Sequence, residues 1–259
     1  MKDPAFPFKS GVWLIIGVLA SALAIVGLVF SGYTIFLRAY LFSYLFWLGL
    51  SLGCLAIAML AYLTNGTWGH VSRWILETGA KTLWLMLILF IPIATGLMRL
   101  YVWAVPAEVQ AQPLLVHKSA YLNVSFFLIR ATVYFAVWIF LTQWLSHMAR
   151  QPETYSNIDK QRNFRASSAV GILIYFLTMT FASIDWIMSL TPEWYSTIFG
   201  MLVILGQALS AFSFVLVLPL AIGGLWMATF TWFITHATFF MPETSTMRAS
   251  AMTKTQSTS

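Results

Sequence analysis

The fold is decided by stretches such as LFSYLFWLGLSLGCLAIAMLAYL, residues 41–63, in which no position carries a charged side chain. A helix rises about 1.5 Å per residue, so a stretch of about 20 residues covers a hydrocarbon core of roughly 30 Å. A segment inside lipid has to be helical, because the bilayer offers its backbone groups no hydrogen-bond partner. We therefore interpret residues 41–63 as one membrane-spanning helix.

The composition of the whole chain agrees with that interpretation. Hydrophobic residues make up 60% and charged residues 8% of the 259 positions, whereas soluble domains carry about 25% charged residues. Further spans are expected at 12–36, ended by Arg38, at 82–103, 123–144 and 168–188, and from Tyr195 onward. A seventh span, 225–240, follows if the helix breaks at Pro219 with Gly223 and Gly224. The expected fold is an all-α, polytopic transmembrane helical bundle of six to seven spans over residues 1–240, with the Ser/Thr-rich residues 241–259 as a disordered tail.

The basic residues orient this bundle. Eight lie on one side of the expected spans and three on the other, and cytoplasmic loops carry the excess of Lys and Arg. The eight are Lys2, Lys9, Arg73, Lys81, Arg150, Lys160, Arg162 and Arg165; the three are Arg38, Arg99 and Lys118. This places the N-terminus in the cytoplasm. The net charge of +6 is dispersed over several loops, which does not suggest a nucleic-acid surface.

Few residues in the chain have the chemistry to hold a cofactor. Cys54 is the sole cysteine, which excludes an intrachain disulfide, a cysteine-ligated iron–sulfur cluster and two-cysteine haem attachment. Of the four histidines only His236 could lie deep in the membrane, so a bound b-type haem is not expected. There is no Gly-rich phosphate loop and no metal-ligand spacing. We expect no catalytic residue, metal or redox centre in this chain.

Two ionisable residues fall inside expected spans, where each costs on the order of 3 kcal/mol. Arg130 lies about two turns into the fourth span, and Asp185 about one turn from the outer end of the fifth. Because both lie toward the outer side, we expect them to pair. One interpretation is a buried ion pair that locks two helices, which we favour; the other is a proton path or a charge that faces a quinol. Glu193 and Gln207 are further candidates for the same pair or path.

Other polar residues near these spans have simpler explanations. Thr191 and Pro192 resemble a helix start, which places Glu193 in a first turn, where a carboxylate suits the helix dipole. Gln207 fits an interhelical hydrogen bond, with a cavity-facing role as the alternative. The stretch GHVSRWILETGAKTLW, residues 69–84, predicts a short amphipathic helix at the cytoplasmic interface or against a partner.

A polar cluster opens the fourth span. It consists of His117, Lys118, Tyr121 and Asn123. Helix capping and interface anchoring explain most of it. The alternative is that His117, Lys118 and Tyr121 meet a quinol head group.

Three stretches resemble the F subunit of bacterial alternative complex III. They are RWILETGAKTLWLMLILFIPIATGLMRLYVWA (73–104), PLLVHKSAYLNVSFFLIRATVYFAVW (113–138) and LTMTFASIDWIMSLTPEWYSTIFGMLVILGQALSAFSF (177–214). The resemblance covers about residues 10 to 215, and FASIDWIMSLTPEWYSTIFG (181–200) is its most specific part.

The resemblance implies a multi-pass subunit of a quinol:electron-acceptor oxidoreductase in the bacterial cell membrane. Such complexes serve respiratory and photosynthetic electron transport and oxidise menaquinol or ubiquinol. Their haem c groups and iron–sulfur clusters belong to partner subunits, a multihaem cytochrome c and an iron–sulfur protein. The F subunit and its homologue, the polytopic C subunit, resemble the membrane subunits of polysulfide reductase. The F subunit is implied to anchor redox subunits and has been proposed to hold a proton path.

This chain departs from the family at its C-terminal side. Family members continue to about ten spans, whereas this chain passes through residues 215–240 into the Ser/Thr-rich tail. The expectation is a shortened subunit or a frameshifted reading, in which a pathway that needs the later spans is incomplete. A stand-alone secondary transporter is an alternative, although the Gly/Pro breaks do not fall in corresponding halves. A quinol-binding catalytic subunit is another alternative.

Overall fold

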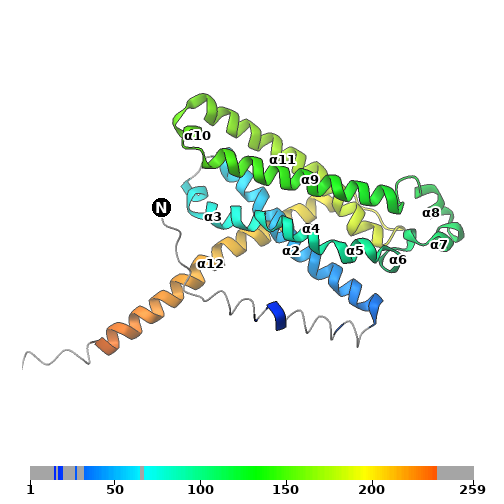
Figure 1. Cartoon of the computed structure of the whole chain (residues 1–259), viewed down its shortest axis with the longest axis horizontal. Helices are drawn as coiled ribbons and strands as arrows, with labels where there is room; N and C mark the ends of the chain where they lie inside the picture. Colours follow the sequence, from blue (N-terminus) through cyan, green and yellow to red (C-terminus); the bar gives the residue numbers. More distant parts are fainter. Residues whose placement is uncertain (1–14, 16, 20–26, 28–31, 65–66, 238–259) are drawn as a thin grey trace, which may run out of the picture. The chain divides into compact units, whose positions relative to one another are not determined.

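The computed structural model describes residues 32–64 and 67–237, together with residues 15, 17–19 and 27. Within these residues the chain is helical and forms no strand (Figure 1). The elements are α2 (Tyr33–Thr64), α3 (Thr67–Lys81), α4 (Leu83–Leu89), α5 (Ile91–Thr95), α6 (Leu97–Leu100), η1 (Val102–Ala104), α7 (Pro106–Ala111), α8 (Pro113–Lys118), α9 (Val124–Arg150), α10 (Glu153–Ser156), α11 (Ile158–Trp186), η2 (Met188–Leu190) and α12 (Phe199–Ala237). The chain forms two compact units, Met1–Phe212 and Ser213–Ser259.

Five helical segments are long and apolar enough to cross a membrane. They are Tyr33–Thr64, Ser72–Thr95, Val124–Arg150, Ile158–Leu190 and Phe199–Leu218. Each contains or overlaps one of the spans expected from the sequence. The predicted all-α class is therefore confirmed and the chain is a membrane protein by the character of its helices. The total of six to seven spans and the cytoplasmic N-terminus stay predictions.

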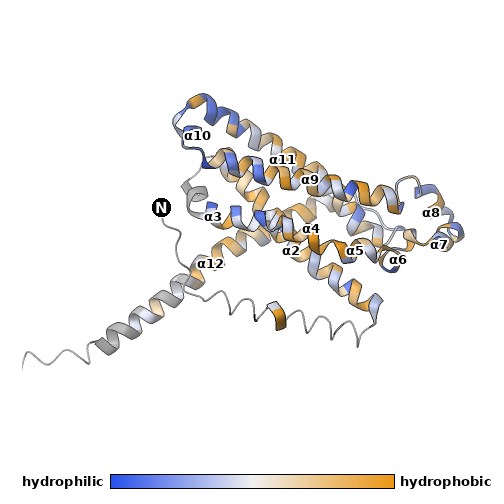
Figure 2. Ribbon diagram, in the orientation of Figure 1, coloured by the Kyte–Doolittle hydropathy of each residue, from blue (hydrophilic) through white to orange (hydrophobic). Residues whose placement is uncertain are grey.

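The helices expose apolar side chains in a way that suits lipid. On α9 the side chains of Ile129, Val133 and Phe140 are more than half exposed, and on α11 so are those of Leu173 and Leu177. Polar residues gather instead toward the two ends of the α9–α11 pair, around α10 and around α7 and α8 (Figure 2). On a surface exposed to water, polar side chains would cover the middle of these helices in place of the apolar ones.

Small residues let the helices of the first unit approach closely. A Cβ atom at Gly53 of α2 would lie 2.1 Å from the backbone oxygen of Gln207 in α12. A Cβ atom at Gly79 of α3 would lie 2.6 Å from the sulfur of Cys54, which is fully buried. Close backbone approach through glycine is typical of helix packing in membranes. Cys54 thus has a packing role between α2 and α3.

The first expected span boundary is wrong. Arg38 does not end a span, because α2 runs without a break from Tyr33 to Thr64. The helix starts instead behind Gly32, whose φ of 77° lies in the left-handed region that favours glycine. Most of the expected span 12–36 lies outside the described residues. An exposed arginine is compatible with a continuous helix because its long side chain can reach the membrane surface.

The expected break at Pro219 is also wrong. The backbone of α12 is helical from Phe199 to Ala237, through Pro219, Gly223 and Gly224. The flanking residues are almost all apolar, and in an apolar medium only helix formation satisfies their backbone groups, which outweighs the one hydrogen bond that proline removes. A separate seventh helix is therefore not found among the described residues, and the expected tail 241–259 lies outside them.

The amphipathic helix expected over residues 69–84 is present as α3, which ends at Lys81. Its apolar side packs along α2, where Ile75, Leu76 and Ala80 are buried. From Ser72 onward the helix belongs to a candidate membrane span. The sequence predicts a helix at the interface before the span; instead, its residues from Ser72 to Lys81 form the beginning of that span.

Candidate functional site

The expected pair of Arg130 and Asp185 forms the centre of the site. Arg130 Nε donates to Asp185 Oδ2 and Arg130 Nη2 donates to Asp185 Oδ1, each over 2.8 Å. The Tyr134 hydroxyl donates to Asp185 Oδ2 over 2.9 Å, and the Asp185 side chain is fully buried. Bidentate geometry of this kind gives the strongest hydrogen bonds between an arginine and a carboxylate. The pair joins α9 to α11.

Two aromatic rings lie against the Arg130 guanidinium. Its central carbon lies 3.9 Å from the ring centroid of Tyr121 and 4.3 Å from that of Phe126. Arg130 Nη1 also donates to the backbone oxygen of Tyr121 over 3.0 Å. The attraction between a cation and a ring face offsets part of the cost of removing the charge from water.

Local structure places both partners at the same end of the helix pair. Asn123 caps α9 by accepting a hydrogen bond from the backbone nitrogen of Phe126 over 2.8 Å, so Arg130 falls about two turns into the helix. Helix α11 ends at Trp186, directly after Asp185, and Tyr101 donates to the backbone oxygen of Trp186 over 3.0 Å. Asp185 therefore lies in the last turn of α11, beside the start of α9.

A pocket of about 310 Å³ lies against this pair. Its lining residues come from α8, the connection between α8 and α9, α11, η2 and the following turn: His117, Lys118, Ala120, Tyr121, Leu122, Ile184, Met188, Ser189, Pro192, Trp194 and Tyr195. We call it the outer pocket. Lys118 Nζ donates to the backbone oxygen of Pro192 over 2.6 Å, which ties the two sides of the pocket together. The three residues expected to face a quinol, His117, Lys118 and Tyr121, thus do share one cavity.

Tyr121 connects the outer pocket to the ion pair. It lines the pocket, and its ring lies against Arg130. Burial, followed by the nearby Asp185 carboxylate, raises the pKa of Tyr121 to about 12. The Tyr121 hydroxyl is buried and interacts with the Asp185 carboxylate and with Tyr134.

The interpretation of Glu193 as a first-turn residue is wrong. Helix α12 begins at Phe199, and Glu193 lies before it in an exposed turn closed by a hydrogen bond from Trp194 N to Thr191 O. Glu193 belongs to no buried ion pair among the described residues. The pattern Thr-Pro-Glu occurs in turns as well as at helix starts. In this chain it forms a turn, and that turn makes one wall of the outer pocket.

Gln207 packs between helices, as expected. The Tyr175 hydroxyl donates to Gln207 Oε1 over 2.6 Å, and Gln207 Nε2 lies 3.5 Å from the sulfur of Met179. Gln207 also lies against Gly49 and Gly53 of α2. It contacts neither Asp185 nor Arg130, so these residues do not form one continuous chain of polar contacts.

Two features of the structure were not anticipated. Tyr134 shares a helix face with Arg130 at four-residue spacing, and this spacing was a signal in the sequence. The second feature is a buried acid at the other end of the bundle. Glu77 accepts hydrogen bonds from Arg73 over 2.6 Å and from Tyr62 over 2.9 Å, and Arg150 lies 3.6 Å away. The four-residue spacing of Arg73 and Glu77 places them on one face of a helix but does not show that Glu77 is buried.

The chain was compared with known proteins. Neither a scan against protein-family models nor a search of curated proteins gives a match. Among the described residues, no group of three His, Cys, Asp or Glu side chains is arranged to hold a metal ion. A proposal for the function therefore rests on the geometry of the site and on the resemblance of the sequence to the F subunit of alternative complex III.

Proposed function

We propose that the chain is a membrane subunit of a bacterial quinol:electron-acceptor oxidoreductase of the alternative complex III type, in which it anchors the redox subunits. The observation that carries this proposal is the stretch 181–200, the part of the sequence that most resembles the F subunit. That stretch supplies Asp185 to the ion pair and Pro192, Trp194 and Tyr195 to the outer pocket. The most specific sequence signature and the most elaborate polar site are thus the same segment.

In this proposal the electrons travel through partner subunits, a multihaem cytochrome c and an iron–sulfur protein, beside a homologous polytopic C subunit. The F-type subunit contributes a rigid bundle in the cell membrane. The ion pair contributes to that rigidity, because it joins α9 to α11 with two hydrogen bonds. The Asp185 carboxylate accepts its hydrogen bonds from protein groups, Arg130 and Tyr134. We favour this structural role for Asp185 over a proton path.

The proposal is tested by purifying the native membrane assembly through a tag on this chain and identifying the proteins that elute with it. We expect a multihaem cytochrome c and an iron–sulfur protein in fixed proportion to the tagged chain. A matched purification through a tag on an unrelated multi-pass protein from the same membrane should give neither. Recovery of the tagged chain without redox proteins would refute the complex and would favour a transporter.

The outer pocket supports a second candidate function, which is contact with the quinol itself. The pocket combines the apolar rings of Trp194 and Tyr195 with the polar groups of His117, Lys118 and Tyr121. A quinol presents the same combination, an apolar ring with two hydroxyl groups. Sites for small molecules typically place a few polar groups in an apolar cavity.

This candidate is tested by labelling the assembled complex with a photoreactive quinone and mapping the modified peptides. Label on peptides that contain Tyr121 or Trp194 is the expected result, with loss of label after Tyr121→Phe. His147→Asn, an exposed histidine at the far end of α9, is the matched control for His117→Asn. Equal labelling of all four proteins would remove the outer pocket from quinol binding without affecting the proposal of a subunit role.

The proton path is tested separately with Asp185→Asn in the assembled complex. Loss of proton translocation while electron transfer and assembly are retained would support a path through Asp185. Loss of assembly would support the ion pair.

A further inference from the structure

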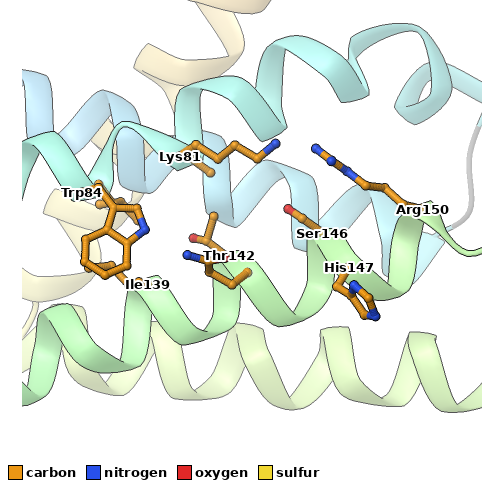
Figure 3. A pocket seen from close by; sticks show the side chains of 10 residues that line it. Lys81, Trp84, Ile139, Thr142, Ser146, His147 and Arg150 are labelled. Carbon is orange, nitrogen blue, oxygen red and sulfur yellow. The ribbon is translucent and has the colours of Figure 1, made fainter. Parts of the chain in front are cut away.

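A second cavity lies at the opposite end of α9 from the Asp185–Arg130 pair. It has a volume of about 330 Å³ and lies between the α3–α4 segment and the C-terminal half of α9 (Figure 3). Its lining residues are Ala80, Lys81, Leu83, Trp84, Ile139, Thr142, Gln143, Ser146, His147 and Arg150. We call it the basic pocket. None of the side chains that line it is a carboxylate.

Of the two cations in the basic pocket, only Arg150 has an acidic partner among the described residues, Glu77 at 3.6 Å. In Figure 3 the charged ends of Lys81 and Arg150 point toward one another. Lys81 forms no ion pair in the part of the chain that the structure describes. The nearest acid, Glu77, is held by Arg73 over 2.6 Å, whereas its distance to Arg150 is 3.6 Å. Two cations that converge without a carboxylate between them repel one another, and an anion between them removes that repulsion.

Neutral polar groups and apolar groups occupy different parts of the same cavity. Thr142, Ser146 and Arg150 follow one another at four-residue spacing along one face of α9, so hydroxyl groups lead from the cation into the pocket. Beyond them the lining is apolar, with Leu83, Trp84 and Ile139 inside candidate membrane spans. The Trp84 side chain is 52% exposed, so this part of the pocket opens onto the lipid-facing surface.

This arrangement matches an amphipathic anion. We propose that the basic pocket binds the phosphate head group of an anionic phospholipid, with Lys81 and Arg150 on the phosphate and an acyl chain along Trp84. The pocket lies at the end of the bundle that carries Arg73, Arg162 and Arg165, which the positive-inside rule assigns to the cytoplasm. Basic pockets between membrane helices on that side are suited to anionic head groups. The inference is independent of the proposed oxidoreductase function.

The test uses the full chain purified in detergent and freed of lipid. Its thermal unfolding is followed during addition of phosphatidylglycerol, phosphatidylcholine or inorganic phosphate, and native mass spectrometry counts the retained lipids. We expect stabilisation by phosphatidylglycerol alone. Each basic residue beside an anionic head group contributes roughly fivefold in affinity, so Lys81→Gln with Arg150→Gln should weaken binding about 30-fold.

Two variants control for general charge effects and for folding. Arg162→Gln with Arg165→Gln removes two exposed charges from the same end of the bundle and should leave phosphatidylglycerol binding unchanged. Lys81→Arg with Arg150→Lys keeps both charges. If binding depends on charge, its affinity for phosphatidylglycerol should lie within about threefold of that of the unmodified chain. Equal effects of the two neutralising pairs would overturn the proposal, as would equal stabilisation by phosphatidylcholine. Stabilisation by inorganic phosphate as strong as that by phosphatidylglycerol would assign the pocket to a free anion instead of a lipid.

Discussion

Replacing Asp185 with asparagine removes one negative charge from a fully buried pair and leaves the shape of the side chain almost unchanged. In the folded chain the carboxylate accepts two hydrogen bonds of 2.8 Å from Arg130 and one of 2.9 Å from Tyr134. The asparagine amide has one acceptor oxygen, so at most part of this arrangement survives. Arg130 then keeps its charge with the Tyr121 backbone oxygen and two aromatic rings as its remaining partners.

The magnitude follows from these contacts. Hydrogen bonds to charged groups contribute about 1.5–3 kcal/mol each, and removing one partner of a buried ion pair typically costs about 3–5 kcal/mol. We expect Asp185→Asn to lower the free energy of unfolding by about 3–5 kcal/mol. The measurement is unfolding of the purified full chain in mixed micelles, with helix content followed by circular dichroism while the denaturing detergent is increased.

Two comparisons make the test specific. Glu193→Gln makes the same change of charge at an exposed turn and should shift the free energy of unfolding by less than about 0.5 kcal/mol. The double variant Arg130→Met with Asp185→Leu leaves no unpaired charge, so it should be more stable than either single substitution. A loss for Asp185→Asn no larger than that for Glu193→Gln, or a double variant whose loss equals the sum of the singles, would refute the reasoning.

Three further predictions concern packing and protonation. Gly53→Ala should lower the free energy of unfolding by about 1–3 kcal/mol, because its new methyl group meets backbone atoms of α12. Its control is Gly206→Ala, which has open space around it and should be neutral or stabilising by about 0.5–1 kcal/mol. Tyr175→Phe removes a buried hydrogen bond to the Gln207 amide and should cost about 1–2 kcal/mol in the same assay; Tyr195→Phe, at an exposed tyrosine, should cost less than about 0.5 kcal/mol. Because the folded chain raises the pKa of Tyr121 from 10.0 to about 12, its neutral form contributes stability that is complete below pH 10 and is lost as the pH rises toward 12. Tyr121→Phe should remove that part of the pH dependence of the free energy of unfolding, and an unchanged profile would contradict the assigned environment.

The membrane-spanning helices were accessible from the sequence because their cause is local. A helix that crosses lipid needs about 20 apolar residues, and each must satisfy its own backbone, so hydropathy along the chain is enough to find it. The same reasoning located Arg130 and Asp185 near one end of their helices and indicated that they pair. It failed at helix boundaries, because α2 begins directly after Gly32 and runs through Arg38, and α12 continues through Pro219.

The tertiary structure decided which polar groups meet. Whether a residue is buried depends on the rotation and offset of its helix against neighbours far along the chain, and hydropathy contains no information on either. Glu77 is buried because α3 packs on α2, and Glu193 is exposed because a turn precedes α12. The sequence by itself determined that this chain crosses a membrane and carries two costly charges. The structure alone joined those charges to Tyr121 and the outer pocket, and brought Lys81 and Arg150 together at the other end, because both sites are built from side chains on different helices.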